Sequence, residues 1–412
     1  MTALAIALPL AWAYLRERVL STVLNIVLLA LGVGTITAML LVLSQSEQRM
    51  ERDAAGIDLV IGAKGSPLQL ILSAVFHVDI PTGNIPLADA QKIAADPMVK
   101  TAVPLSLGDS YRSFRLVGTR PTFLDLYAAA PASGRVWAKP MEVFIGAEVA
   151  TATGLVIGSR FAGSHGLSAG GGSHEATPFE VVGIAAPTGS VIDRLILTSL
   201  DSIWDVHEHG AKPATGAPRY ANIAGEKHAE EDREITALLV QYASPMAAVS
   251  LPRRVNAESR LQAASPALET ARLFALVGVG VNALKGFAGV LMICAGLGIF
   301  VGLLNALDDR RADLALLRVL GANRATVFLT VLAQGFALGI AGVILGIVVG
   351  HAGVEWAGRA VEKVHRVAFT GRSWAPGEFW VVGIALGLSW LAGLFPAWRA
   401  YRQAVPELLG RA

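Results

Sequence analysis

The sequence predicts an α-helical membrane protein with four transmembrane helices and a large extracytoplasmic α+β domain between helices 1 and 2. Three observations predict this fold class. First, 53% of the 412 residues are hydrophobic and only 16% are charged, which is too apolar for an ordinary soluble domain. Second, the apolar residues gather in four stretches, each close to the ~20 residues that a membrane-crossing helix needs. Third, Lys and Arg are distributed unevenly around these stretches.

The four apolar stretches have recognisable ends. They are Val19–Leu43, Gly286–Leu307, Val327–Gly350 and Phe379–Ala397. Arg16 and Arg18 follow the apolar run Ala3 to Pro9 instead of preceding it, which is the reverse of a signal peptide. We therefore expect the segment before Val19 to be an interfacial helix, and the first stretch to be an uncleaved anchor.

The basic residues predict the orientation. Those that place a segment in the cytoplasm are Arg16 and Arg18 before the first span; Arg310, Arg311, Arg318 and Arg324 between the second and third; and Arg399, Arg402 and Arg411 after the fourth. Four other basic residues oppose this assignment, because they lie between the third and fourth spans: Arg359, Lys363, Arg366 and Arg372. Since three segments agree, we expect both termini to be cytoplasmic.

These spans divide the chain into nine segments. In order, we expect a cytoplasmic interfacial helix (1–18), the first transmembrane helix (19–45), the extracytoplasmic α+β domain (46–270), a stalk with the second transmembrane helix (271–307), a cytoplasmic coupling helix (308–326), the third transmembrane helix (327–351), a short extracytoplasmic loop (352–377), the fourth transmembrane helix (378–398) and a cytoplasmic tail (399–412).

The inserted segment has the mixed periodicity of an α+β domain. Strands are predicted at 99–107, 111–118, 142–145, 179–185 and 235–242, and helices at 86–96, 198–207 and 246–256, with a helical stalk at 267–284. Gly108 and Asp109 are predicted to form the turn between the first two strands, and Thr198 or Ser199 to cap the second helix.

The segment Asp308 to Phe328 between the second and third spans predicts a short amphipathic helix. Asp308 and Asp309 can cap its start, and Leu314 and Leu317 give it an apolar face. Gly321 is expected to end this helix, and Asn323 can cap the next one. Such an element could contact a cytoplasmic partner. The alternative, a positive-inside loop without a partner, is equally compatible with these residues.

Three motifs resemble FtsX/MacB/LolC-type (type VII) ABC transporter permeases. Leu317 to Arg324 resembles the coupling pattern LRxLGAxR. The C-terminal Phe395 to Leu409 is similar to the closing pattern PAxRAxxxxPxExL. Leu15-Arg16-Glu17-Arg18 is similar to the segment that precedes the first span in this family. Each motif is weak alone, but together with the order of spans the resemblance extends over essentially the whole chain. It implies that the inserted segment is a MacB-like periplasmic core domain.

The resemblance also implies a mechanism and a set of partners. Two permease copies, here a homodimer, would pair with separate cytoplasmic ABC ATPase subunits that bind ATP and Mg. No GxxxxGK[ST] phosphate loop occurs in this chain, so we expect a non-catalytic subunit without a cofactor of its own. The residues implied to couple to the ATPase are Arg310, Arg311, Asp313, Leu314, Leu317, Arg318, Gly321, Ala322 and Arg324.

The implied role is transmission of ATP-driven motion to the extracytoplasmic domain, in a bacterial inner membrane. The cargo of export or extraction could be a lipoprotein, lipid, peptide, drug or metal-linked substrate, and a periplasmic binding or adaptor protein and membrane lipid are further expected partners. Nucleic acid is not expected, because no Lys/Arg block occurs. The alternative is an FtsX-like regulator of a cell-wall enzyme, or a metal-sensing scaffold.

Five of the eight histidines lie in two Gly-rich segments of the inserted region. They are His165, His174, His207, His209 and His228. Imidazole and nearby carboxylates suit zinc, but no regular spacing defines four ligands. Zinc binding is therefore one interpretation, and solvated loop histidines are the other.

Two further patterns have alternative interpretations. The apolar residues within Asp58 to Ile85 could form a lipid-contacting surface or simply pack in a core; they are Leu68, Leu70, Ile71, Leu72, Val75 and Phe76. Glycines at four-residue spacing in the spans could pack helices within one chain or form a dimer seam; they are Gly298 with Gly302, Gly335 with Gly339, Gly342 with Gly346 and Gly350, and Gly383 with Gly387.

Overall fold

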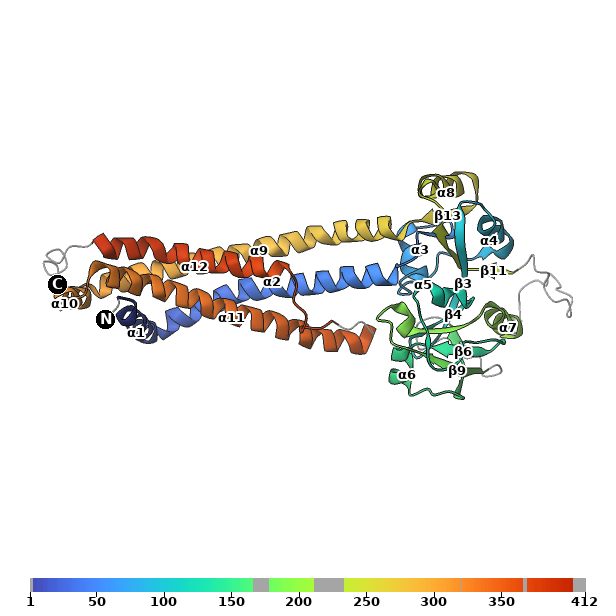
Figure 1. Ribbon diagram of the computed structural model, residues 1–412, viewed down its shortest axis with the longest axis horizontal. Helices are drawn as coiled ribbons and strands as arrows, with labels where there is room; N and C mark the ends of the chain where they lie inside the picture. Colours follow the sequence, from blue (N-terminus) through green and yellow to red (C-terminus); the bar gives the residue numbers. More distant parts are fainter. Residues whose placement is uncertain (1–2, 166–177, 211–232, 320, 366–368, 403–412) are drawn as a thin grey trace, which may run out of the picture. The chain divides into compact units, whose positions relative to one another are not determined.

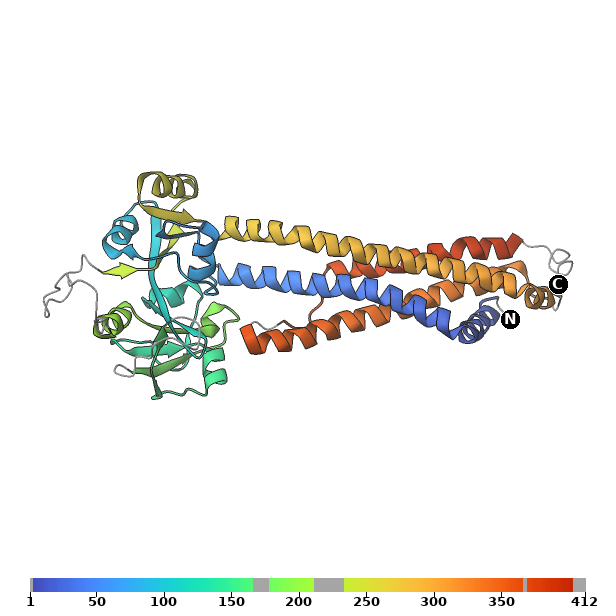
Figure 2. The same ribbon diagram turned by 180° about the vertical axis from the view of Figure 1, so that it is seen from behind.

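A computed structural model describes residues 3–165, 178–210, 233–319, 321–365 and 369–402 of the chain. The chain divides into two compact units, which are considered separately. One consists of Met1–Glu47 and Leu276–Ala412 and is called the membrane unit here, and the other is Gln48–Ala275, the inserted domain. Figures 1 and 2 show the elements of both units from opposite sides.

The membrane unit consists of helices. They are α1 (Ala3–Glu17), α2 (Val19–Asp53), α9 (Pro266–Asp309), α10 (Arg311–Val319), α11 (Arg324–His365) and α12 (Gly377–Arg402). The last residues of α2, from Gln48, and the first of α9, up to Ala275, belong to the inserted domain. By length and composition, α2, α9, α11 and α12 are long and apolar enough to cross a membrane. This confirms the predicted fold class of four transmembrane helices with an α+β domain between the first and second.

Several helices are longer than the segments predicted from the sequence. Most of the short loop expected at 352–377 is helical, because α11 continues to His365. Glu355 and Arg359 form an ion pair at the i, i+4 spacing that stabilises a helix beyond the apolar stretch. The expected coupling segment 308–326 is likewise divided between the end of α9, α10 and the start of α11.

Glycines bring the helices of the membrane unit close together. A Cβ added at Gly346 would lie 2.7 Å from Cβ of Val33 on α2, and one at Gly339 would lie 2.6 Å from Cβ of Ser389 on α12. The first three glycine repeats therefore pack within one chain. Only the fourth differs, because an added Cβ at Gly383 or its repeat partner would meet nothing within 4 Å among the described residues.

The inserted domain is built on one large mixed sheet. Its strands are β1 (Leu59–Ala63), β3 (Val99–Tyr111), β4 (Phe114–Thr119), β5 (Pro131–Gly134), β6 (Glu142–Ile145), β7 (Arg160–Phe161), β8 (Ser164–His165), β9 (Phe179–Ala185), β10 (Leu195–Ser199), β12 (Ala237–Tyr242) and β13 (Leu261–Ala264). The order is β13-β1-β12-β3-β4-β10-β6-β9-β5, with β7 and β8 pairing at the side of this path. β4 with β10 and β6 with β9 are parallel, and the other pairs are antiparallel. β2 (Ile85–Pro86) and β11 (Glu234–Ile235) form a separate ribbon.

Helices cover both faces of this sheet. They are α3 (Pro67–Ala74), α4 (Leu87–Ala94), α5 (Thr122–Leu126), α6 (Ala147–Thr153), the 3₁₀ turn η1 (Val191–Arg194), α7 (Leu200–Gly210) and α8 (Pro245–Glu258). Because side chains alternate along a strand, neighbouring residues enter different cores. Val60 packs with α3 and α5 on one face, whereas Leu59 and Ile61 pack with α4 and α8 on the other (Figures 1 and 2).

The turn between β3 and β4 differs from the prediction. Gly108 and Asp109 lie inside β3, where the pairing register with β4 shifts as a β-bulge. The chain instead turns at Arg112 and Ser113, which both adopt left-handed backbone conformations with φ of 47° and 72°. The predicted turn was therefore wrong, because a bulge accommodates the same residue types as a turn. Ser199 proves to be the cap of α7, accepting a hydrogen bond from the Ser202 amide.

The apolar residues of Asp58 to Ile85 mostly belong to the core. Leu70, Ile71, Val75 and Phe76 are buried in the cluster on the α3 face of the sheet. Ser66 caps α3, its hydroxyl accepting a hydrogen bond from the Gln69 amide, so this helix is fixed at its start. The core-packing interpretation of these four residues is confirmed.

Candidate coupling site

The turn from α9 through α10 into α11 rests on an apolar cluster at one end of the membrane unit. Leu303 and Leu307 of α9, Leu314 of α10 and Val331 of α11 are buried together, and Ala397 of α12 completes the cluster. Four helices, α10 included, thus meet at this cluster. Because these contacts come from different helices, α10 is packed against the bundle and is not suspended in a loop.

Three consecutive charged residues at this turn join different helices. Their side-chain contacts are Asp308 with Arg399 of α12 at 3.4 Å, Asp309 with Arg18 beside α1, and Arg310 with Glu17 of α1. The two aspartates lie in the last turn of α9, and α10 begins only at Arg311. The expectation that they cap α10 was therefore wrong.

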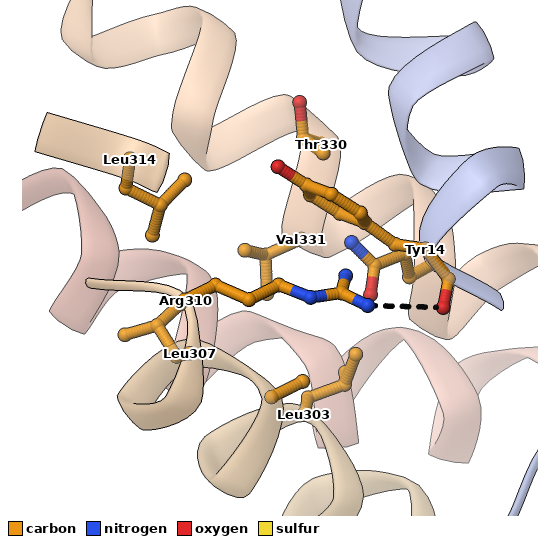
Figure 3. A pocket seen from close by; sticks show the side chains of 9 residues that line it. Tyr14, Leu303, Leu307, Arg310, Leu314, Thr330 and Val331 are labelled. Carbon is orange, nitrogen blue, oxygen red and sulfur yellow. Dashed lines mark hydrogen bonds between the residues drawn. The ribbon is translucent and has the colours of Figure 1, made fainter. Parts of the chain in front are cut away.

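Arg310 is the most enclosed member of this charged group. Its guanidinium carbon lies 3.8 Å from the centroid of the Tyr14 ring, and Nη2 donates a 3.4 Å hydrogen bond to the Tyr14 carbonyl oxygen. Figure 3 shows Arg310 extending toward Tyr14 across a small pocket that is also lined by Thr330 and Gln334 of α11. Tyr14 thereby provides a flat surface on which the guanidinium stacks.

The two sides of α10 differ. Leu314 is buried and Leu317 is partly buried against the apolar cluster, so both face the rest of the chain. Leu316 and Val319 are 60% and 65% exposed on the opposite side of the helix. An exposed pair of large apolar side chains in a short helix is a feature of contact surfaces.

The link from α10 to α11 is short and has defined geometry. Gly321 has a φ of +100°, a left-handed conformation that residues with a Cβ rarely adopt. The Ala322 amide donates to the Leu317 carbonyl oxygen at 3.0 Å, which closes the end of α10. Asn323 caps α11, because its Oδ1 accepts from the Thr326 amide at 2.8 Å. The predicted roles of Gly321 and Asn323 are confirmed.

The structure separates the nine residues implied to couple to an ATPase. Arg310, Leu314 and Leu317 face the bundle, whereas Asp313, Gly321 and Arg324 are exposed. Arg318 and Ala322 are half-buried, and Arg311 belongs to α10 with its side chain outside the described set. The three inward residues therefore position α10, whereas Asp313, Gly321 and Arg324 are accessible to another protein.

Sequence reasoning missed Leu316 and Val319, together with Tyr14 and Glu17. The run LALLRV places leucines on both sides of the helix, so its periodicity alone does not define which side is buried. The contact of α1 with the α9–α10 turn joins residues that are 296 positions apart in the sequence. Only the opposite charges of Glu17 and Arg310 hinted at it.

The histidine segments give no metal site that can be described. His165 ends β8, and His207 and His209 lie in the last turns of α7, with only their backbones described. His174 and His228 fall outside the described residues. Among the described residues, no group of three or more His, Cys, Asp or Glu side chains is arranged to hold a metal ion. Zinc binding stays a prediction.

Two family models match the chain. Residues 22–268 match the MacB-like periplasmic core domain, and residues 285–405 match the FtsX-like permease C-terminal region. The first match spans α2 and the inserted domain, and the second covers α10, α11 and α12. The chain belongs to the FtsX/MacB/LolC family of ABC transporter permeases, the transmembrane components of these transporters. It is accordingly a bacterial inner membrane protein.

Individual relatives resemble parts of the chain. The lipoprotein-releasing system transmembrane protein LolC of Xylella fastidiosa is 30% identical over 116 residues, 24% of this chain and 28% of LolC. The periplasmic region of MacB from Actinobacillus actinomycetemcomitans covers 54% of this chain with 95% of its own length, at 11% identity and a TM-score of 0.34. The extracellular domain of YknZ, a noncanonic ABC-type transporter from Gram-positive bacteria, covers 50% with 98% of its length, at 12% identity and a TM-score of 0.30.

Proposed function

We propose that this permease subunit transmits ATP-driven conformational change from a separate cytoplasmic ATPase, through α10, to its inserted domain. The observation that carries the proposal is the two-sided packing of α10. Its inner side is fixed to the bundle by Leu314, whereas Leu316 and Val319 on its outer side are exposed. A partner that binds the outer side would therefore move the helices to which the inner side is packed.

The charged contacts of the turn support the same role. Asp308, Asp309 and Arg310 join α9 to α12 and α1, so a displacement of α10 would reach these helices together. Exposed ion pairs are individually weak, at about 0–1 kcal/mol, but Arg310 is nearly enclosed and also stacks on the Tyr14 ring. In this proposal α10 is the contact element, and the charged turn is the linkage to the bundle.

The class of cargo stays open in this proposal. Export or extraction of a lipoprotein, lipid, peptide, drug or metal-linked substrate all fit a permease that moves its extracytoplasmic domain. The name of the Xylella relative refers to lipoprotein release, which favours a lipid-modified cargo for this chain. An open glycine surface around Gly383 on α12 supports a second copy of the permease as a partner.

The test replaces the outer apolar pair of α10. Leu316→Asp with Val319→Asp, made together in the full-length protein, should abolish co-purification of an ABC ATPase and its associated ATP hydrolysis. The matched control is Met246→Asp with Val249→Asp on α8, because these residues are also an exposed apolar i, i+3 pair, at 71% and 63% exposure.

Both double variants should keep the thermal stability of the wild-type protein, since all four side chains are exposed. The proposal is wrong if the α10 variant retains both the ATPase and its stimulated ATP hydrolysis, or if the α8 variant loses them equally. An ATPase that binds but is no longer stimulated would still place the contact on α10.

A further inference from the structure

The loop between α11 and α12 is fastened to the bundle by a buried histidine and glutamate. His351 of α11 places Nδ1 2.6 Å from the Gly371 carbonyl oxygen and Nε2 2.9 Å from Oε2 of Glu378 on α12. The other carboxyl oxygen of Glu378 accepts a hydrogen bond from the Ala375 amide at 2.7 Å. The two side chains are 15% and 1% exposed. Their contact therefore takes place largely out of water.

Other contacts hold the same loop in place. Gln45 of α2 exchanges two hydrogen bonds with the Thr370 backbone, at 2.8 and 2.9 Å. Glu355 of α11 accepts from the Gly371 amide at 3.0 Å. The loop thus contacts α2, α11 and α12, and it lies at the end of α11 opposite to α10 (Figure 1). Within this arrangement, the hydrogen bond between His351 and Glu378 is the buried contact, and it is called the His351–Glu378 tie here.

The hydrogen count of this tie can be deduced from its geometry. A carbonyl oxygen only accepts, so the hydrogen bond to Gly371 requires a hydrogen on Nδ1 of His351. One further hydrogen must then lie between Nε2 and the carboxyl oxygen of Glu378, either on the imidazolium or on the carboxylic acid. Without it, two lone pairs would face each other in a dehydrated site, which is repulsive.

We propose that His351 and Glu378 together form a binding site for one proton, and that loss of this proton loosens the α11–α12 loop at its contact with His351. This proposal is independent of the ATPase contact on α10. It assigns to the loop two states, with and without the His351–Glu378 hydrogen bond, and makes the free energy difference between these states depend on pH.

The surrounding charges do not replace this tie. Among the described residues of the packed elements, Glu355 and Arg359 of α11 pair with each other, and Arg372 of the loop is exposed. From α2 the contact to the loop is made by the uncharged Gln45.

The test uses Glu378→Gln as a permanently protonated mimic. A glutamine can accept from the Ala375 amide through its oxygen and donate to His351 through its nitrogen, so it supplies the shared hydrogen at every pH. Amide hydrogen exchange of the peptide covering residues 369–377 is measured in the full-length wild-type and variant proteins between pH 5.5 and pH 9. Comparison at equal pH cancels the intrinsic dependence of exchange on pH.

At pH 5.5 the loop amides should exchange at the same rate in the wild-type and Glu378→Gln proteins. At pH 9 they should exchange roughly tenfold faster in the wild-type protein, which is the effect of losing one hydrogen bond. A ratio that stays constant over this range overturns the proposal. Glu355→Gln is the matched control, because it weakens the same loop without removing the shared hydrogen, and should speed exchange equally at every pH. If Glu378→Gln does not fold, a wild-type protection factor that is independent of pH overturns the proposal.

Discussion

The guanidinium of Arg310 stacks on the ring of Tyr14, with 3.8 Å between the guanidinium carbon and the ring centroid. Tyr14 belongs to α1 and Arg310 follows α9, so this contact joins the start of the chain to the turn that leads into α10. Glu17 pairs with the same arginine. The first helix is therefore an integral part of the candidate coupling site.

Substitution of Tyr14 tests this junction. Tyr14→Phe retains the ring and should be near neutral, whereas Tyr14→Leu removes the stacking and should cost about 0.5–2 kcal/mol of stability. Thermal unfolding of the purified full-length proteins measures both. If coupling passes through this turn, Tyr14→Leu should also reduce the stimulated ATP turnover of the complex. Equal behaviour of the two variants would exclude a role for the ring.

Breaking the buried ion pair between Asp53 and Arg194 should destabilise the inserted domain strongly. Their side chains are 3% and 13% exposed and lie 3.1 Å apart, and Tyr127 donates a hydrogen bond to the Asp53 carbonyl oxygen. Asp53→Asn leaves the Arg194 charge buried without a counter-ion, so we expect a loss of about 3–5 kcal/mol. Denaturant unfolding of the full-length protein provides the measurement.

An exposed ion pair supplies the comparison for this prediction. Arg160 and Glu180 lie 2.7 Å apart on the surface of the same sheet. Glu180→Gln should change the free energy of unfolding by less than about 1 kcal/mol, since water and salt screen such pairs. Similar losses for both variants would contradict the importance assigned to burial.

His77 should make the inserted domain less stable in mild acid. Neither ring nitrogen has a hydrogen-bond partner among the described residues. Burial, reinforced by the charges of Arg115 and Arg194, holds the pKa of the imidazole well below its usual range. The unfolded chain then binds a proton below about pH 6.5 while the folded domain does not, so stability falls with decreasing pH, by at most about 1.4 kcal/mol per pH unit.

The variant His77→Asn removes this titration. Asparagine tolerates the left-handed φ of 55° at this position better than most residues. The stability of the wild-type protein should decrease more between pH 7 and pH 5.5 than that of the variant, as measured by chemical unfolding. Parallel curves for the two proteins would show that His77 does not titrate differently in the folded and unfolded chains.

The glycine contact between α11 and α2 should be sensitive to a single methyl group. Gly346→Ala would place a Cβ 2.7 Å from Cβ of Val33 and 2.9 Å from the Ala30 carbonyl oxygen. We expect a loss of about 1–3 kcal/mol, because the helices must separate. Gly383→Ala is the control, with open space around it, and should leave the thermal midpoint of the monomer unchanged.

The sequence was sufficient to predict elements with a strong local signal. The strands Glu142–Ile145 and Phe179–Ala185 were predicted to the residue, because apolar residues there are bounded by turn formers. The β3–β4 turn was misplaced, since the bulge at Gly108 depends on how the partner strand pairs. Local chemistry identifies the kinds of residue that interrupt a strand, but the pairing decides whether the chain turns there.

The candidate sites were less predictable for a related reason. Which face of α10 is buried depends on the surface that the other helices offer to it. The composition of α10 alone is compatible with burial of either Leu314 or Leu316. The His351–Glu378 tie joins residues that flank a loop, and neither belongs to a recognisable motif. Such contacts are properties of the packed bundle and are not encoded in any short stretch of sequence.

The order Asp308, Asp309, Arg310 also fixes the rotation of α9 about its own axis. Each residue of a helix points about 100° away from its predecessor, so a one-residue insertion just before Asp308 would turn a carboxylate toward Glu17. A one-residue deletion there would turn the Arg310 guanidinium toward Arg18. Either change sets like charges against each other. The helix can thus be lengthened or shortened only in steps that restore its angular phase, which limits how this family member can be spliced to other permeases.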